Sequence, residues 1–552
     1  MSAVSETLKN AAARHAPEAS AEWWRGAVIY QIYPRSYLDT NKDGVGDLAG
    51  ITQKLDYIAK LGVDAIWISP FFKSPMRDYG YDVSDFCDVD PVFGSLADFD
   101  ELVARAHALG VKVIVDQVYS HTSDQHPWFM ESRSGRDNPK ADWYVWADPR
   151  EDGSPPNNWL SVFGGSAWTW DSRREQYYLH NFLIEQPDLN LHVPAVQDAV
   201  LQVAQFWLDR GVDGFRLDAV NFFLHDQQLR DNPPAPPEAP RRCPFDYQAH
   251  VYNQSRPGVE NILERLRAIT DARGDIFTVA EIGDPKPRLE MKTYTSGEKR
   301  LNSAYGFEFL YANDMLPDLI RSVLSAFATD NADGWPSWAF SNHDAPRAVS
   351  RWAKAEDRDR AARLYALLLM SLRGNVFLYQ GDELGLPQAD VPFERLKDPE
   401  AIANWPLTLG RDGARTPMPW SANAKHAGFS DAEEAWLPVD ARHVPLSAEA
   451  QENDPTSVLN FVRHMTALRR SSPALRSGSI EFLETAPGVC AFVREAGGEK
   501  LVCIFNFNDT DTEAPKLQGA WSIEASSAPD AGANSPPALL PPLSGFIARL
   551  MG

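Results

Sequence analysis

The sequence predicts an α/β protein: a (β/α)8 TIM barrel with a small domain inserted after its third strand and an antiparallel β-sandwich at its C-terminal end. Three observations support this fold class. Strand-like apolar stretches alternate with helical patterns, one connection over residues 122–194 is unusually long, and short β-like stretches replace the alternation from residue 473 onward. Strands that alternate with helices form parallel βαβ units, and eight such units close into a barrel.

The predicted strands recur along the first three quarters of the chain. They cover residues 28–37, 64–70, 111–119, 211–221, 277–282, 303–311, 338–343 and 375–380. Helical spacing of apolar residues predicts helices over 48–61, 99–109, 199–209 and 357–372. In a barrel of parallel strands, side chains at the carboxyl ends of the strands converge on one mouth. Functional residues are therefore expected at the ends of these strands.

Two breaks in the alternation predict the domain boundaries. The connection over residues 122–194 is rich in Trp, Pro, Gly, Asp and Asn and is too long for a loop, which indicates an inserted domain. The barrel itself is expected to comprise residues 1–121 and 195–472. Residues 473–552 are typical of a β-sandwich domain, because turns separate their short β-like stretches. These stretches cover 479–483, 488–493, 500–507 and 545–550.

Composition and charge narrow the choice of partners. The net charge of −23 argues against nucleic acid and against an anionic membrane surface. No run approaches the ~18 apolar residues of a membrane-spanning helix, and the N-terminal stretch lacks the apolar core of a signal peptide. Few cysteines in so long a chain favour a reducing compartment. The expectation is a cytoplasmic protein, monomer or homodimer, that acts on a small-molecule substrate.

The stretch GVDGFRLDAVN at 211–221 carries the strongest local signal. Arg216 and Asp218 lie two residues apart in a buried strand, so their side chains point to the same face. A buried carboxylate and guanidinium must pair or take part in chemistry, because an unpaired buried charge is costly. The arginine is also expected to keep Asp218 ionised, as a nucleophile requires. Taken alone, the pattern is more typical of a structural ion pair.

Polar residues also follow several of the other predicted strands. Glu281 ends the fifth strand and Asp344 follows the seventh, so three carboxylates, including Asp218, meet at one mouth. Further polar residues at the ends of the second, third and seventh strands are Tyr81, Asp82, His121 and His343. A purely structural cluster of three carboxylates would destabilise the fold by like-charge repulsion, so the cluster favours a catalytic site.

These stretches resemble the signature regions of the α-amylase superfamily of glycoside hydrolases (family 13), and the resemblance covers nearly the whole chain. It implies that Asp218 is the nucleophile, Glu281 the general acid and base, and Asp344 a residue that distorts and holds the sugar. His121 and His343 would hydrogen-bond the hydroxyls of the bound ring. Retaining glycosidases place two carboxyl groups about 5–5.5 Å apart, and adjacent strands about 4.7–4.9 Å apart can supply that spacing.

The sequence QPDLN at 186–190 resembles a region of the oligo-1,6-glucosidase and α-glucosidase subgroup. In that subgroup a salt bridge, matched here by Asp82 and Arg411, closes the non-reducing end of the pocket, which implies an exo-acting enzyme for short chains. Ala219 follows the nucleophile and matches the α-1,4-cleaving members, whereas α-1,6-cleaving members usually carry Val there.

The resemblance implies several further substrate contacts. Tyr81, Phe163 and Phe182 are expected to be pocket aromatics, although the two phenylalanines equally fit the core of the inserted domain. Arg347 is expected to reach the leaving sugar, and Arg216 to lie beside the nucleophile.

The loop DTNKDGVGD at 39–47 resembles the oxygen-rich calcium loop of an EF-hand, with Gly44 at its turn. The subgroup binds a structural Ca²⁺, with Mg²⁺ as the alternative ion, at the matching loop. The implied ligands are Asp39, Asn41, Asp43, Asp47 and the backbone of Val45. A solvated turn is the competing interpretation. Ser120 stands where amylases have an Asn that binds a different calcium, which argues against that second site. No organic cofactor is implied.

The sequence therefore predicts a retaining exo-α-glucosidase that hydrolyses terminal α-1,4-linked glucose from maltose and short α-glucosides, with some transglucosylation. An oligo-1,6-glucosidase, a sucrose hydrolase, a trehalose-converting enzyme and a glucosyltransferase stay open, because one methyl-sized difference in a pocket discriminates by only about 10–200-fold. A non-enzymatic transporter heavy chain of the same family would carry a transmembrane segment and a broken triad, and this sequence shows neither.

Overall fold

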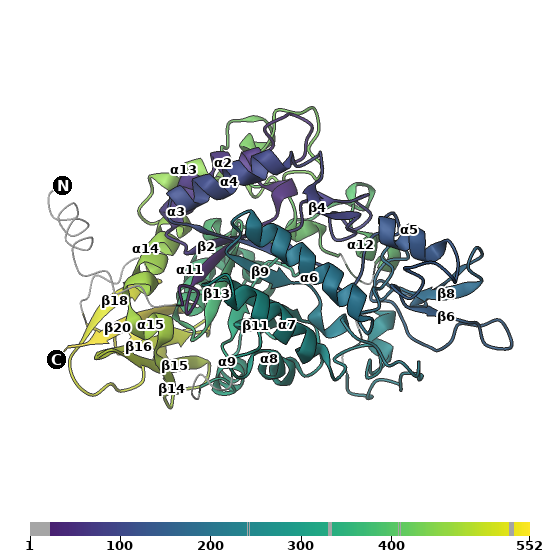
Figure 1. The fold of residues 1–552 in the computed structure, drawn as a ribbon. Coiled ribbons are helices and arrows are strands. Elements are labelled where there is room, and N and C mark those ends of the chain that lie inside the picture. Colours follow the sequence, from purple (N-terminus) through teal and green to yellow (C-terminus); the bar gives the residue numbers. More distant parts are fainter. Residues whose placement is uncertain are drawn as a thin grey trace.

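The computed structural model describes residues 22–239, 241, 243–328, 334–406, 408, 410–528 and 535–551. Its centre is one parallel sheet of eight strands that curls into a barrel (Figure 1). In chain order the strands are β1 (Val28–Ile32), β2 (Ala65–Ile68), β5 (Lys112–Gln117), β9 (Gly214–Leu217), β10 (Phe277–Ile282), β11 (Ser303–Gly306), β12 (Ser337–Ala339) and β13 (Asn375–Tyr379). Ala304 of β11 bridges Pro336 in parallel, which closes the ring between β11 and β12. The predicted barrel is confirmed.

Helices cover the outside of the barrel (Figure 1). They are α2 (Leu48–Gln53), α3 (Leu55–Leu61), α4 (Leu96–Ala108), α6 (Pro194–Asp209), α7 (Val259–Asp271), α8 (Pro287–Thr295), α9 (Pro317–Ser325), α10 (Ala348–Trp352), α11 (Arg358–Ser371) and α14 (Val458–Ser471). The helix predicted over 48–61 is two helices, because Lys54 leaves the helical region at φ −98° and ψ 4°. None of the described helices is both long and apolar enough to cross a membrane.

All the predicted barrel strands except 277–282 end earlier than the sequence indicated, and for two of them the cause is local. β1 stops at Ile32 because a 3-10 turn with Pro in its first position follows at Pro34–Ser36. β9 stops at Leu217 because Ala219 adopts a left-handed backbone conformation, with φ 45° and ψ 46°. These turns lie at the carboxyl ends of the strands, so the polar residues that follow gather at the barrel mouth.

The connection between β5 and α6 forms a small unit of its own, which lies at one side of the barrel in Figure 1. It contains α5 (Pro127–Arg133) and an antiparallel sheet in the order β6 (Trp146–Ala147), β8 (Gln176–Leu179) and β7 (Trp168–Asp171). Its apolar core is built around Trp159, Trp168 and Leu179. Two further excursions leave the barrel: the hairpin of β3 (Phe72–Lys73) and β4 (Asp85–Val89), and the segment with α12 (Pro399–Asn404) and α13 (Ala448–Glu452).

An antiparallel sheet follows the barrel and lies at the end opposite the insertion (Figure 1). After α15 (Pro473–Ser477) come its five strands: β14 (Ser479–Phe482), β15 (Val489–Ala496), β16 (Glu499–Asn506), β18 (Trp521–Ser526) and β20 (Ser544–Leu550). A ribbon of β17 (Thr512–Glu513) and β19 (Leu539–Leu540) contributes Leu540 to the apolar cluster of this sheet. The predicted β-like stretches correspond to four of these strands, and β18 was missed.

The barrel interior is solid beneath its mouth. Trp67, Phe277, Tyr305 and Phe377 pack together in one apolar cluster inside the ring of strands. Tyr305 and Trp67 also carry polar atoms that reach upward to charged groups. The core therefore supports the site from below and excludes water from its underside.

Candidate active site

Arg216 lies at the centre of the mouth and is completely buried. Its Nη1 lies 2.6 Å from an oxygen of Asp116 and 2.7 Å from an oxygen of Asp218. Its Nη2 lies 2.5 Å from Glu281 Oε1. The guanidinium also stacks 4.9 Å above the Trp67 ring. One fixed cation therefore holds three carboxylates, two of which are the predicted nucleophile and acid/base.

The register of two neighbouring strands brings Asp218 and Glu281 together. Leu217 of β9 pairs with Ala280 of β10, so the two acids are the next residue on each strand. The left-handed turn at Ala219 points its amide at Glu281 Oε2, at 3.3 Å. The Tyr305 hydroxyl, 3.1 Å from Glu281 Oε1, donates to the other oxygen. Backbone geometry thus fixes the acid/base candidate against the nucleophile candidate.

Burial and the Arg216 charge act in opposite directions on the pKa values of Asp218 and Glu281. Burial raises the pKa of Asp218 to about 7 and that of Glu281 to about 7, although Arg216 opposes both shifts. Burial raises the pKa of Asp116 to about 6. The expectation that Arg216 keeps Asp218 ionised is not met, because burial outweighs the guanidinium and the nearby carboxylates act in the same direction as burial. Asp218 and Glu281 titrate as a coupled pair that retains a proton near neutral pH.

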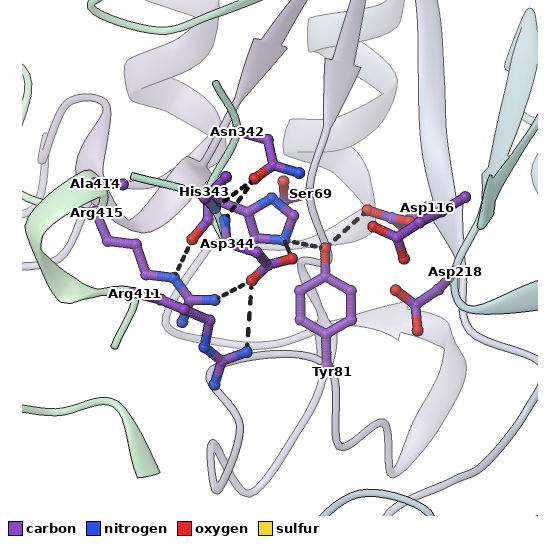
Figure 2. A network of polar contacts seen from close by, with 12 residues as sticks. Ser69, Tyr81, Asp116, Asp218, Asn342, His343, Asp344, Arg411, Ala414 and Arg415 are labelled. Carbon is purple, nitrogen blue, oxygen red and sulfur yellow. Dashed lines mark hydrogen bonds and ion pairs between the residues drawn. The ribbon is translucent and has the colours of Figure 1, made fainter. Parts of the chain in front are cut away.

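Asp344, in the loop after β12, has the opposite environment (Figure 2). Its Oδ1 lies 2.7 Å from Arg415 Nη2 and 3.5 Å from Arg411 Nη1, and its Oδ2 lies 3.2 Å from His343 Nε2. Asn342 shapes the loop by accepting the amide hydrogen of Asp344 at 2.9 Å. Burial acts to raise the pKa of Asp344, but His343 and the two guanidiniums outweigh it and hold that pKa well below its usual range.

Tyr81 lies between the carboxylates around Arg216 and the loop that carries His343 and Asp344. Its ring stacks on His343 at 5.4 Å, and its hydroxyl lies 2.6 Å from His343 Nε2 and 3.3 Å from Asp116 Oδ2 (Figure 2). His121 borders the same site, with Nδ1 2.9 Å from Ser120 Oγ and Nε2 3.0 Å from the Tyr81 carbonyl. Burial lowers the pKa of His121 to about 4, so this histidine is neutral at physiological pH.

The predicted salt bridge between Asp82 and Arg411 is wrong, because Arg411 pairs with Asp78 instead. Arg411 Nη2 lies 2.8 Å from Asp78 Oδ1 and 2.7 Å from Asp398 Oδ1. Asp82 turns back into its own loop, where it accepts the Ser74 hydroxyl and the amide hydrogens of residues 77 and 78 at 2.8–3.0 Å. Two aspartates four residues apart in one turn were indistinguishable by type, and only the fold shows which faces the arginine.

The two phenylalanines lie at the mouth. Phe163 lies beneath Arg411, 5.1 Å from the guanidinium carbon, and Phe182 contacts the His121 ring at 5.0 Å. Neither belongs to the apolar core of the inserted unit. Arg347, by contrast, is buried beneath the loops, where it bonds the carbonyls of Gln380 and Ala414 at 3.0 and 3.3 Å. The structure therefore does not place Arg347 where it could reach a leaving sugar.

Several residues of the site were not predicted. They are Asp78, Tyr305, Asp398, Glu400 and Arg415. Asp116 stands among the polar residues at the end of the predicted third strand, although no role was assigned to it from the sequence. Asp398, Glu400 and Arg415 come from an irregular segment with no periodic pattern, so their convergence depends on the folded chain.

The loop at 39–47 curls around Asp39. Its two carboxylate oxygens accept the amide hydrogens of Lys42 at 2.7 Å and of Gly44 at 2.8 Å, while Asp47 caps α2 by accepting from Gly50. Carboxylate, amide and carbonyl oxygens suit a hard cation such as Ca²⁺. Among the described residues, no three His, Cys, Asp or Glu side chains converge on one metal position. An ion here would also need the Asn41 amide and the Val45 carbonyl, so the metal remains a prediction.

A barrel that gathers paired carboxylates around one arginine at its mouth has the architecture of a glycoside hydrolase. The chain belongs to the α-amylase family, glycoside hydrolase family 13: residues 31–478 match the family described as "Alpha amylase, catalytic domain". It is a hydrolase of the α-glucosidase and oligo-1,6-glucosidase group, as its relatives show.

Two curated relatives and one solved structure define this neighbourhood. The chain is 55% identical over 500 residues to a probable α-glucosidase of Rhizobium meliloti (strain 1021), covering 89% of this chain and 90% of the relative. It is 37% identical over 519 residues to an oligo-1,6-glucosidase of Parageobacillus thermoglucosidasius, covering 88% and 91%. The crystal structure of the α-glucosyl transfer enzyme XgtA superposes with a TM-score of 0.91 at 51% identity, over 96% of this chain and all of that chain.

Proposed function

We propose that this protein is a retaining exo-α-glucosidase that releases terminal α-1,4-linked glucose from maltose and short α-glucosides. One observation carries the proposal: a single guanidinium, that of Arg216, contacts both Asp218 and Glu281 at the ends of adjacent strands. Neighbouring strands lie about 4.7–4.9 Å apart, a spacing compatible with the about 5–5.5 Å between the carboxyl groups of retaining glycosidases, which favours the retaining mechanism over the inverting one.

In the first step the Asp218 carboxylate forms a bond to the anomeric carbon as the glycosidic bond breaks. Glu281 gives its proton to the leaving oxygen, so the aglycone departs neutral. In the second step Glu281 takes a proton from water, which attacks the anomeric carbon and frees Asp218. The raised pKa of about 7 for Glu281 supports its role as the acid near neutral pH.

Asp344, His121 and His343 bind the sugar and take no part in making or breaking covalent bonds. Asp344 stays ionised beside two guanidiniums, so it can accept hydrogen bonds from ring hydroxyls throughout the reaction. His121 and His343 are buried and neutral, and each can hydrogen-bond a hydroxyl without adding charge. Binding energy from these groups can assist the distortion of the ring toward the transition state.

Arg411, Asp78 and Phe163 form a wall on the Asp344 side of the mouth, and we assign to this wall the blocked end of the pocket. Asp78→Asn should raise KM for maltose at least about tenfold, because it leaves a buried guanidinium less well paired. Asp82→Asn is the matched control, since it changes the same turn but leaves Arg411 paired. Steady-state kinetics on maltose and on a longer maltodextrin would show the difference. An equal rise in KM from Asp82→Asn would show that Asp82 also closes this end of the pocket.

The experiment that tests the function is product analysis by proton NMR on maltose, isomaltose, sucrose and trehalose. Initial release of α-glucose from maltose, well ahead of the others, is the expected result. Faster cleavage of isomaltose would favour an oligo-1,6-glucosidase, as one relative is named, and would remove the argument from Ala219. Initial release of β-glucose from p-nitrophenyl α-glucoside, whose only sugar is the transferred residue, would overturn the retaining mechanism and Asp218 as nucleophile.

We also propose that the glucosyl group is transferred to acceptors other than water. The similarity to the α-glucosyl transfer enzyme XgtA supports this, as does a covalent intermediate that any suitable hydroxyl could intercept. At high maltose concentration, fewer than two glucose molecules should be released per maltose consumed, and tri- or higher saccharides should accumulate. A constant ratio of two glucose molecules per maltose at all concentrations would contradict transfer.

We propose that the loop at 39–47 binds a structural Ca²⁺ through Asp39, Asn41, Asp43, Asp47 and the Val45 carbonyl. A ligand at about 100 times its Kd stabilises the folded state by about 2.7 kcal/mol. Chelation should therefore lower the Tm of the native protein by a few degrees, and Ca²⁺ should restore it. Asp43→Ala should abolish this response, whereas Asp431→Ala, which changes an exposed partner of Lys42 outside the loop, should preserve it.

A further inference from the structure

His343 is held between aromatic rings and cannot rotate. Its imidazole, completely buried, stacks on Tyr81 at 5.4 Å with an interplanar angle of 10°, and on Tyr33 at 5.6 Å with an angle of 24°. Trp67 packs edge-on at 6.0 Å. Each ring nitrogen therefore meets a fixed set of partners, and the hydrogen bonds at one nitrogen determine what the other nitrogen can do.

The two nitrogens face different partners. Nδ1 lies 2.8 Å from Nε2 of Gln31, a buried residue of β1. Nε2 lies 2.6 Å from the Tyr81 hydroxyl and 3.2 Å from Asp344 Oδ2. An ionised carboxylate accepts hydrogen bonds and donates none, so a hydrogen on Nε2 is needed for the contact with Asp344 to be favourable.

The His343 ring is neutral, so its two nitrogens carry one hydrogen between them. Burial lowers the pKa of His343 to about 3, which Arg415, Arg216 and Arg411 reinforce and which only Asp344 opposes. The neutral ring then carries its hydrogen on Nε2, and Nδ1 has a lone pair. A lone pair requires a donor, which is the amide N–H of Gln31. The Asp344 carboxylate thus determines that the N–H end of the Gln31 amide, and not its oxygen, faces His343 Nδ1.

The same direction of hydrogen bonding continues toward the catalytic pair. With Nε2–H directed at the Tyr81 oxygen, the Tyr81 hydroxyl is free to donate to Asp116 Oδ2 at 3.3 Å. Asp116 in turn accepts from the Trp67 indole at 3.0 Å and pairs with Arg216 at 2.6 Å. In the other tautomer, with the hydrogen on Nδ1, the Tyr81 hydroxyl would donate to His343 Nε2 and lose its hydrogen bond to Asp116.

We propose that Gln31 is a positioning residue of this active site, which donates to His343 Nδ1 and thereby keeps the ring hydrogen on Nε2, on the side of Tyr81 and Asp344. The proposal deepens the glucosidase assignment and rests on it for the identity of the sugar. Gln31 Oε1 is buried without a hydrogen-bond partner among the described residues. An amide retained despite an unsatisfied oxygen supports a role for its N–H.

Two substitutions at this position separate positioning from packing. Gln31→Met keeps the shape but removes the donor, and by analogy with residues that orient catalytic histidines it should lower kcat/KM about 10–100-fold, mainly through kcat. Gln31→Glu replaces the donor with a carboxylate that only accepts. His343 would then need hydrogens on both nitrogens, so its pKa should rise and a new ionisation should appear in the pH–rate profile between pH 5 and 9.

The control is Gln380→Met, which changes an equally buried glutamine on the adjoining strand segment. Gln380 accepts the Tyr33 amide hydrogen at 2.8 Å and has no hydrogen bond to His343 among those found in the described chain. It should alter Tm without a new ionisation. If Gln31 only filled space, Gln31→Met would retain the native kcat/KM and the His343 ring in Gln31→Glu would keep a single hydrogen, and the proposal would be overturned.

The tautomer itself is measured by ¹⁵N-histidine NMR on the full-length protein without substrate. His343→Gln identifies which of the 12 histidine signals belongs to residue 343. The expected native spectrum has a protonated Nε2 and an unprotonated Nδ1 for this residue, and Gln31→Glu should show both nitrogens protonated. A native ring protonated on Nδ1 would overturn the proposal. Because this readout needs no turnover, it is independent of which sugar the enzyme cleaves.

Discussion

The two halves of the mouth surround their acids with different numbers of cations. In one half the single guanidinium of Arg216 contacts Asp116, Asp218 and Glu281. In the other half the Asp344 carboxylate contacts two guanidiniums, those of Arg411 and Arg415, and the neutral imidazole of His343 (Figure 2). Arg411 also pairs with Asp78 and Asp398, so the halves differ in the cations around each acid rather than in their total charge. Their protonation differs accordingly, although both lie at the ends of barrel strands.

The comparison shows that burial alone does not decide the charge of an active-site acid. Burial is the largest influence on the pKa of Asp218, Glu281 and Asp344 alike, and it acts to raise all three. Local cations outweigh it only at Asp344, where the pKa is lowered. One half can therefore keep the proton that acid catalysis needs, while the other presents a permanent anion to the sugar.

The largest expected effect comes from removing the nucleophile. Asp218→Asn should reduce kcat by about 10⁴-fold or more, because no other group can form the covalent bond to the sugar. Asp213→Asn is the matched control: this buried aspartate precedes the same strand, where it pairs with Lys112 at 2.9 Å, away from the mouth. Kinetics on p-nitrophenyl α-glucoside should separate the two variants. Near-native turnover by Asp218→Asn would contradict the mechanism.

Removing one cation from the second half should make it resemble the first. Arg415→Gln should raise the pKa of Asp344 and move the acid limb of the pH–rate profile to higher pH. Losing a charged hydrogen bond of about 1.5–3 kcal/mol should also lower kcat/KM by roughly 10–150-fold. Arg415→Lys retains the positive charge and should move the acid limb much less. Equal displacement by both variants would show that geometry, not charge, controls Asp344.

The smallest and most diagnostic effect is on stability, where the two halves should respond with opposite sign. The folded pKa of Asp218 is raised, so its ionisation lowers stability as pH rises from about 4, the unfolded value, to about 7. Asp218→Asn should therefore raise Tm at pH 8 by roughly 2–4 °C for each kcal/mol recovered. Differential scanning calorimetry of the native protein and the variant would measure the change.

Asp344→Asn should lower Tm at pH 8, because Arg411 and Arg415 lose their shared carboxylate. The folded pKa of Asp344 is depressed, so its contribution to stability is present above its unfolded value and disappears as the pH falls through the folded one. The difference between this variant and the native protein should accordingly shrink below about pH 4. A decrease in Tm for both variants would contradict the difference in surrounding cations on which the comparison rests.

Strand positions and the residues that share one face of a strand could be predicted from the sequence, because both depend on short stretches of chain. The strand at 277–282 was placed with its correct bounds because its residues, FTVAEI, are mostly apolar and β-favouring, with Glu281 as the one charged residue. Asp218 and Arg216 were found because their spacing puts both on one face of a short strand. Helix breaks and early strand ends were missed at Lys54 and Ala219, where a single residue leaves the regular backbone conformation.

The sequence by itself determined the barrel, its family and the three acids at its mouth, since apolar periodicity and strand-end position are properties of short stretches of chain. Only the tertiary structure decided that Asp78 rather than Asp82 faces Arg411, and that Arg216 is shared by three carboxylates. It also decided which cations surround Asp344. Electrostatic environment is set by all groups within a few ångströms, and here those groups come from segments 71 and 333 residues apart in the chain.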